Sequence, residues 1–159
     1  MINLKEVVEL DEKLKFVEQF VADLPEWVGE NTTIHDVIES VGSFESTPFF
    51  VAIDGSETVG FICLKIYNAY TAEIAMMAVL GSQHGKGIGK KLVIRCEEFC
   101  RDNKMEFLTV KTIDESGEND NYGSTRAFYR ALGFKPLQVF PKFWGEGQHC
   151  LFSVKCISY

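Results

Sequence analysis

The residues best suited to chemistry stand in a glycine-rich run, QHGKGIG, which contains Gly85, Gly87 and Gly89. A strand-like apolar run precedes it and a helical pattern follows it, so we expect a turn from a strand into a helix. The first N–H groups of a helix lack carbonyl partners and lie at the positive end of its dipole. Such a turn is typical of an anion site, and of a phosphate site in particular.

The spacing of these glycines excludes two other phosphate-binding motifs. The dinucleotide fingerprint requires G-x-G-x-x-G in a parallel strand–helix–strand unit, whereas this run reads G-x-G-x-G after a predicted antiparallel meander. The Walker loop requires Ser or Thr after Gly-Lys, whereas Gly89 is followed by Lys90 and Lys91. A third alternative stays open on these residues alone, namely that the glycines only permit a tight turn.

Two further side chains are candidates for proton transfer. Tyr129 lies in the short helical pattern STRAFYRAL, and a phenol with a pKa of about 10 can protonate a leaving thiolate. Glu73 lies near the start of the strand pattern TAEIAMMAVL, where alternation places it in a cleft or in open solvent. Each also has a structural interpretation, Tyr129 as a core residue and Glu73 as a solvated surface carboxylate.

Both motifs resemble those of the GNAT superfamily of N-acetyltransferases. AEIAMMAVLGSQHGKGIGKKL resembles motif A, in which a strand leads into a Q/R-x-x-G-x-G/A turn whose amides hold the pyrophosphate of coenzyme A. NYGSTRAFYRALGF resembles motif B, whose short helix carries an F/L-Y pair and ends in GF. The resemblance covers roughly residues 49–155.

The resemblance implies acetyl-CoA as co-substrate and no metal. The implied coenzyme contacts are the strand residues that border the pantetheine arm, the glycine turn, and the start of the motif B helix: Met77, Ala78, Val79, His84, Gly85, Lys86, Gly87, Ile88, Gly89, Lys90, Asn121, Tyr122 and Thr125. Three of these positions depart from the family pattern. His84 replaces Gln or Arg and offers fewer donors to phosphate, so binding is expected to be weaker or pH-dependent, and Tyr122 and Thr125 replace Asn and Ala.

The implied reaction is direct attack of a primary amine on the thioester in a ternary complex. Tyr129 and Glu73 are its predicted catalytic residues, with a bound water as the alternative base. The acceptor is a small molecule or a peptide, bound near the first two helices and the aromatic loops 67–70 and 143–148. An acyl-CoA-binding regulatory domain without transferase activity, and an interaction domain that binds no coenzyme, remain the alternatives.

The pattern of elements predicts a single GNAT domain over residues 1–159. The expected fold is a mixed α/β (α+β) sandwich, with a mostly antiparallel central sheet of about seven strands and four helices. The expected strands cover residues 2–4, 49–54, 58–67, 71–80, 105–113, 135–140 and 149–153. The expected helices run from Asp11 to Pro25, from Thr33 to Gly42, over 88–104 and over 124–132.

Composition narrows the class of protein. The 23 Asp and Glu against 16 Lys and Arg give a pI near 5.0, which argues against nucleic-acid binding. No apolar stretch is long enough for a bilayer and no signal pattern precedes the first elements, so we expect a cytoplasmic monomer or homodimer. The spacing of the three His and five Cys predicts no metal site, and we expect the thiols to be reduced and buried.

Overall fold

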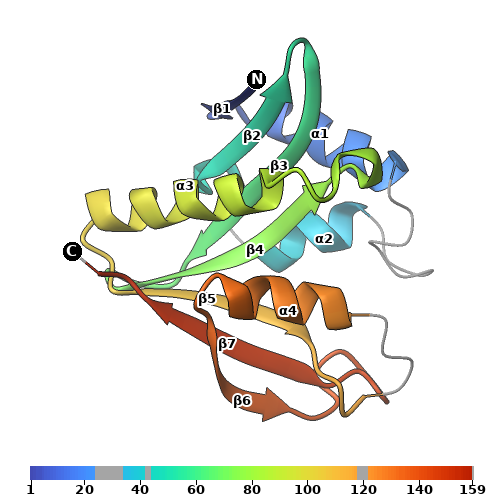
Figure 1. Ribbon diagram of the computed structural model, residues 1–159, viewed down its shortest axis with the longest axis vertical. Helices are drawn as coiled ribbons and strands as arrows, with labels where there is room; N and C mark the ends of the chain where they lie inside the picture. The colour runs from blue at the N-terminus through green and yellow to red at the C-terminus, as the bar shows by residue number, and fades with distance from the viewer. Residues whose placement is uncertain (24–33, 42–43, 118–121, 159) are drawn as a thin grey trace. The chain divides into compact units, whose positions relative to one another are not determined.

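The computed structural model describes residues 1–23, 34–41, 44–117 and 122–158. These ranges hold seven strands and four α-helices (Figure 1). The strands are β1 (Ile2–Glu6), β2 (Phe49–Asp54), β3 (Glu57–Ile66), β4 (Thr71–Val79), β5 (Phe107–Ile113), β6 (Lys135–Phe140) and β7 (Cys150–Cys156). The helices are α1 (Leu10–Asp23), α2 (Ile34–Val41), α3 (Ile88–Asp102) and α4 (Gly123–Ala131), with 3₁₀ turns η2 (Phe44–Ser46) and η3 (Gly81–Gln83).

The predicted fold class is confirmed, and the differences lie at the ends of elements. Helix α3 stops at Asp102, two residues before the predicted end, because Lys104 adopts a left-handed φ of 58°. The Met105 N–H then bonds the Cys100 carbonyl at 2.8 Å and the Lys104 N–H bonds the Arg101 carbonyl at 3.0 Å, which is a Schellman cap. Strand β7 continues to Cys156 because it stays paired with β5 along its whole length.

The three boundary residues Pro25, Thr33 and Gly42 lie outside the described residues.

All seven strands belong to one sheet of order β1-β2-β3-β4-β5-β7-β6. The pairs β1–β2, β2–β3, β5–β7 and β6–β7 are antiparallel. Strands β3 and β4 form a hairpin, since the Tyr67 N–H bonds the Thr71 carbonyl and the Leu80 N–H bonds the Val59 carbonyl, both at 3.0 Å. The predicted meander of β2, β3 and β4 is therefore confirmed.

The parallel pair β4–β5 is short. Its register covers four positions, from Thr71 opposite Phe107 to Ile74 opposite Val110. Strand β4 itself runs five residues further, so the backbone of 75–79 is not part of this parallel ladder.

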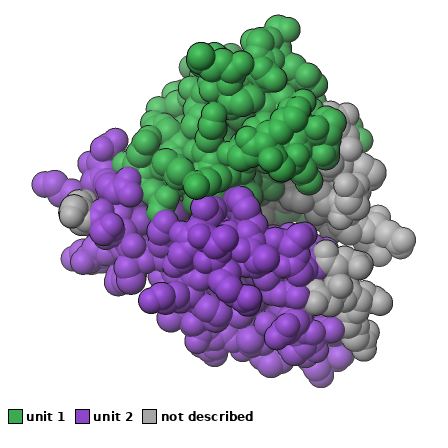
Figure 2. Space-filling view, viewed as in Figure 1, with its two compact units in different colours: residues 1–66, 75–99 green, residues 67–74, 100–159 purple. Residues whose placement is uncertain are grey.

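Contacts divide the chain into two compact units (Figure 2). Unit 1 comprises residues 1–66 and 75–99, and unit 2 comprises residues 67–74 and 100–159. The predicted single-domain organisation stays a prediction.

Unit 1 has apolar packing on both faces of β2. Phe49 stacks on Phe61 with ring centroids 5.2 Å apart, and Phe20 of α1 packs on the same Phe61 ring at 5.2 Å. Phe50 points to the other face, where the Arg95 guanidinium of α3 lies 4.4 Å from its ring centroid. Strand alternation thus places α1 and α3 on opposite faces of this part of the sheet.

The five cysteines are free thiols, four of them buried and Cys156 exposed. Burial is the largest influence on two of these thiols. It raises the pKa of Cys63 to about 12 and that of Cys150 to about 11. Both thiols therefore stay protonated at neutral pH. The expectation of buried thiols holds at every position except Cys156, whose side chain lies near the end of β7.

Among the residues that the structure describes, no helix has the length and apolar character needed to cross a bilayer. Within the same ranges, no cluster of three or more His, Cys, Asp or Glu is arranged to hold a metal ion.

A buried lysine holds the 3₁₀ turn η2 against α1. Lys13 is 2% exposed, and its Nζ donates to the carbonyl oxygens of Phe44, Glu45 and Thr47 at 3.2, 2.9 and 2.7 Å. Burial, the largest influence, lowers the pKa of this ammonium. The three carbonyls replace the hydrogen bonds to water that the ammonium loses on burial. Lys13 therefore has a structural role.

Replacing Lys13 tests this interpretation. We expect Lys13→Met to lower the free energy of unfolding by roughly 2–4 kcal/mol, because three carbonyls lose a charged donor. Chemical denaturation measures the change. The exposed Lys15 on the same helix gives the control Lys15→Met, and equal stability of the two variants would contradict the prediction.

Candidate active site

The glycine turn after β4 is built on left-handed backbone. Gly85 and Gly87 have φ values of 80° and 78°, and a Cβ added at either position would meet nothing within 4 Å. Glycine is therefore required by the backbone conformation and not by lack of space. Any other residue would bear a cost of roughly 1–2 kcal/mol or would reshape the turn.

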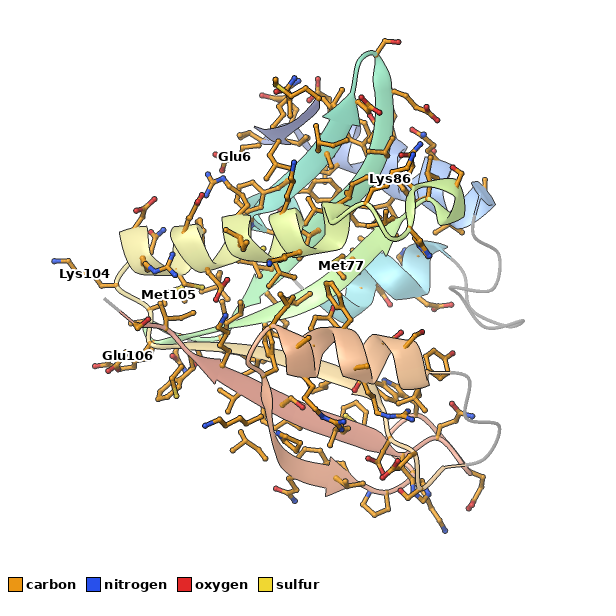
Figure 3. All side chains as sticks on the ribbon, in the orientation of Figure 1. Glu6, Met77, Lys86, Lys104, Met105 and Glu106 are labelled. Atoms are coloured by element: carbon orange, nitrogen blue, oxygen red, sulfur yellow. The ribbon has the colours of Figure 1, made fainter. Side chains whose placement is uncertain are left out.

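The start of α3 offers unpaired donors. The Lys91 N–H bonds the Gly87 carbonyl at 3.1 Å, which is the first hydrogen bond of the helix. The N–H groups of Ile88, Gly89 and Lys90 therefore have no acceptor carbonyl within the helix. The first turn contains no acidic residue, and Lys86 lies on the turn just before it (Figure 3). A lysine at the N-terminus of a helix destabilises the helix, because its charge repels the positive end of the dipole. The same charge strengthens the binding of an anion there.

His84 fastens this turn to the end of β4. Its Nε2 lies 2.8 Å from the carbonyl oxygen of Val79. A carbonyl only accepts, so Nε2 carries a proton and donates it. The residue that departs from the family's Gln or Arg thus has a contact that shapes the turn.

The predicted strand residues Met77, Ala78 and Val79 end β4 and precede this turn in unit 1 (Figure 3 labels Met77). Here β4 approaches β3 closely, since a Cβ at Gly60 would lie 3.1 Å from the Ala78 carbonyl oxygen and 3.3 Å from Leu92 Cδ1. The structure therefore brings the predicted strand residues and the predicted turn together in one unit.

Glu73 lies in unit 2 and is 8% exposed, so the alternative of a solvated surface carboxylate is wrong. Its Oε2 accepts a 2.7 Å hydrogen bond from Lys111 Nζ, and the same Nζ lies 3.2 Å from the Tyr67 hydroxyl oxygen. Burial alone would lower the pKa of Lys111, but the bonds to Glu73 and Tyr67 outweigh it and the pKa is raised. Lys111 therefore stays protonated at neutral pH.

Sheet register explains why these residues meet. Glu73 lies opposite Thr109 in β5, and Lys111 follows two residues later on the same face. Lys111 in turn lies opposite Phe152 of β7. Sequence reasoning missed Lys111 and Phe152, because finding them requires the register of three strands that are distant in the chain.

Tyr129 lies on the other face of β5. It is 7% exposed, packs edge-on against the Phe134 ring at 5.4 Å, and lines a pocket together with Val110, Thr112 and Arg126. Val110 and Lys111 are consecutive and point to opposite faces. In unit 2 the predicted acid and the predicted base therefore flank the same strand from its two sides.

The remaining predicted coenzyme neighbours lie at the start of α4. Tyr122 is the N-cap residue and is 40% exposed, and Thr125 lies in the first turn and is half-buried. Asn121 lies outside the described residues.

A second polar cluster anchors the loop after β5. The Ser116 hydroxyl donates to Asp114 Oδ2, so the neighbouring His149 Nδ1, 3.0 Å away, is the donor to Ser116 Oγ. Burial alone would raise the pKa of Asp114. Hydrogen bonds from Ser116 and the charge of Arg126 outweigh burial, and the pKa is lowered. The Ser116 hydroxyl hydrogen is engaged in the hydrogen bond to Asp114, so His149 cannot accept it as a general base. The contacts of this cluster are therefore structural.

The same loop fixes the aromatic loop near residue 143. The Asp114 N–H bonds the His149 carbonyl at 2.9 Å, and a Cβ at Gly117 would lie 2.5 Å from the Gly147 carbonyl oxygen. Only glycine permits this approach at position 117. The loop that carries Phe143 and Trp144 is thus held at its C-terminal end.

Comparison with known proteins agrees with the motifs. A model of the acetyltransferase (GNAT) domain family matches residues 45–136. An uncharacterised N-acetyltransferase of Chlorobaculum tepidum is 25% identical over 127 residues, which cover 78% of this chain and 72% of that protein.

Solved structures share the fold. A putative GNAT-family acetyltransferase of Desulfovibrio desulfuricans superposes with a TM-score of 0.81 at 18% identity, covering 99% of this chain and all of the other. An aminoglycoside 6′-N-acetyltransferase complexed with coenzyme A superposes with a TM-score of 0.73 at 20% identity, covering 99% and 98% of the two chains. The matched domain spans more than half of the sequence and contains both motifs, and the chain belongs to the GNAT family of acetyltransferases.

Proposed function

We propose that residues 1–159 form one GNAT domain that transfers an acetyl group from acetyl-CoA to a primary amine of a small molecule or peptide. The observation that carries this proposal is the turn 84–90. It combines left-handed glycines, unpaired helix N–H groups and three nearby lysines, and it directly follows the strand that the family uses for the pantetheine arm. Such a turn fits a diphosphate.

The proposed coenzyme site starts at this turn. The N–H groups of 85–90 and the ammonium groups of Lys86 and Lys90 bind the pyrophosphate, and His84 holds the turn in place through Val79. The pantetheine arm runs along Met77, Ala78 and Val79, whose backbone lies beyond the β4–β5 ladder. Asn121, Tyr122 and Thr125 complete the proposed contacts. The fold match to an aminoglycoside acetyltransferase solved with coenzyme A supports this assignment.

The proposed reaction is direct attack by the amine in a ternary complex. The amine nitrogen forms a bond to the thioester carbonyl carbon while Glu73, or a water bound to it, accepts the amine proton. The C–S bond then breaks, and Tyr129 gives its proton to the departing thiolate. A backbone N–H near Ala78 or Val79 stabilises the oxyanion.

The two faces of β5 constrain where the thioester lies in this proposal. Tyr129 approaches from the face of Val110 and Glu73 from the face of Lys111. One reacting carbon is accessible to both only in the plane of the sheet, where the β4–β5 ladder ends at Ile74 and Val110. The Lys111 ammonium lies 2.7 Å from the Glu73 carboxylate, so the proposed proton acceptor has a cationic neighbour.

A pair of glycine variants tests the coenzyme site. Gly87→Ala should weaken acetyl-CoA binding at least about fivefold, because alanine resists the φ of 78° and shifts the N–H groups. Gly55 has a φ of 64° and equally open surroundings, yet it lies in the β2–β3 turn. Gly55→Ala is therefore the matched control, and calorimetric Kd values that rise equally in both variants, or in neither, would refute the site.

Tyr129→Phe tests the acid. We expect kcat to fall roughly 100-fold or more, since the thiolate loses its proton donor, while the KM for acetyl-CoA stays within about twofold. Steady-state kinetics over both substrates measures the two constants. Unchanged turnover would remove Tyr129 from the reaction.

A screen of acceptors tests the activity itself. We expect at least one of five amine classes, among them diamines, aminoglycosides and peptide N-termini, to release coenzyme A from acetyl-CoA. Thiol reagents also label the exposed Cys156, so the screen uses Cys156→Ser. Tight acetyl-CoA binding without release on a broad panel would favour the regulatory alternative.

A further inference from the structure

We propose that Glu73, Tyr67, Phe143 and Phe152 form a binding site for a primary alkylammonium ion, which Lys111 occupies in this structure and which the ammonium group of the acceptor occupies in its place. We call these four residues the ammonium cage. The cage as a cation site stands on its own geometry. That its external ligand is the acyl acceptor rests on the proposed function.

The cage surrounds its cation with one carboxylate and three rings. Lys111 Nζ lies 2.7 Å from Glu73 Oε2. It lies 5.6, 5.7 and 5.8 Å from the ring centroids of Tyr67, Phe143 and Phe152. All three distances are within the roughly 6 Å at which a ring face attracts a cation.

The chemistry of the cage selects a class of ligand. The carboxylate accepts an N–H bond and balances one positive charge, and the Tyr67 hydroxyl oxygen adds a second contact at 3.2 Å. The rings favour the alkyl part next to the charge and repel anions. The end of a lysine side chain is itself a butylammonium group, so the present occupant shows the ligand type that fits.

The cage residues differ in their exposure to solvent. Tyr67 and Phe143 are 46% and 49% exposed, whereas the Glu73 side chain is only 10% exposed. Two rings of the cage are therefore partly exposed to solvent, and the carboxylate is buried. The Phe143 ring packs against Phe140 and Trp144, with ring centroids 6.1 and 5.2 Å apart.

Lys111 acts in this arrangement as a tethered competitor. Because it belongs to the same chain, its effective concentration at the cage is high, and an external ammonium must displace it. Displacement brings the incoming ammonium next to Glu73, the proposed proton acceptor. The lysine thus keeps the buried carboxylate paired until a substrate of the right charge arrives.

Removing the competitor tests the proposal without any acetyl-CoA. Butylammonium chloride is titrated into the wild type, Lys111→Ala and the double variant Lys111→Ala/Glu73→Gln, with calorimetric detection. We expect binding at least about tenfold tighter in Lys111→Ala than in the wild type, and loss of binding in the double variant. Butanol, which has the same length and no charge, is the control ligand. Equal affinities in wild type and Lys111→Ala, or equal binding of butanol, would overturn the cage.

A second measurement uses the unaltered protein, in case Lys111→Ala does not fold. Three nearby rings shift the NMR signal of the Lys111 Cε away from those of exposed lysines. In ¹³C-lysine-labelled protein, butylammonium should move this signal toward the exposed position and butanol should not. A signal that stays fixed at saturating butylammonium would overturn the displacement. Normal acetyl-CoA binding in that case leaves the proposed function intact, and failed acetyl-CoA binding with intact ammonium binding overturns only the proposed function.

Discussion

The parallel contact between β4 and β5 ends after four residue pairs, and the positions of the candidate catalytic groups depend on that short ladder. Up to Ile74 and Val110 the ladder aligns Glu73 with Thr109 and so brings Lys111 within reach of the carboxylate. After Ile74, β4 continues without β5 and leads through Val79 into the glycine turn. A longer ladder would extend the pairing of β4 with β5 beyond these four positions.

The glycine turn adds a second constraint, which is local and purely conformational. Gly85 and Gly87 adopt left-handed φ values, and the His84 contact with Val79 fixes the turn to the strand. These features lie within a dozen residues of one another along the chain. They are therefore the part of the site that short-range sequence patterns describe well.

This difference in range explains what the sequence could predict. The seven strands, the four helices and the glycine turn follow from periodicity and from glycine placement, which are local signals. The end of α3 was misjudged because Lys104 takes the left-handed cap position usually marked by glycine. Lys111 and Phe152 were not found because their meeting with Glu73 depends on strand register, and a shift by one residue would send each to the opposite face.

Side chains along β5 point alternately to its two faces, and this affects which substitutions the protein can accept in evolution or engineering. Side chains at even positions such as Val110 and Thr112 face α4, and the odd position Lys111 faces the aromatic residues of the loops. Substitutions on one side of the strand leave packing on the other side largely unaltered. A library confined to Tyr67, Lys111 and Phe143 would therefore vary one face of β5 and leave unchanged the residues that pack against α4.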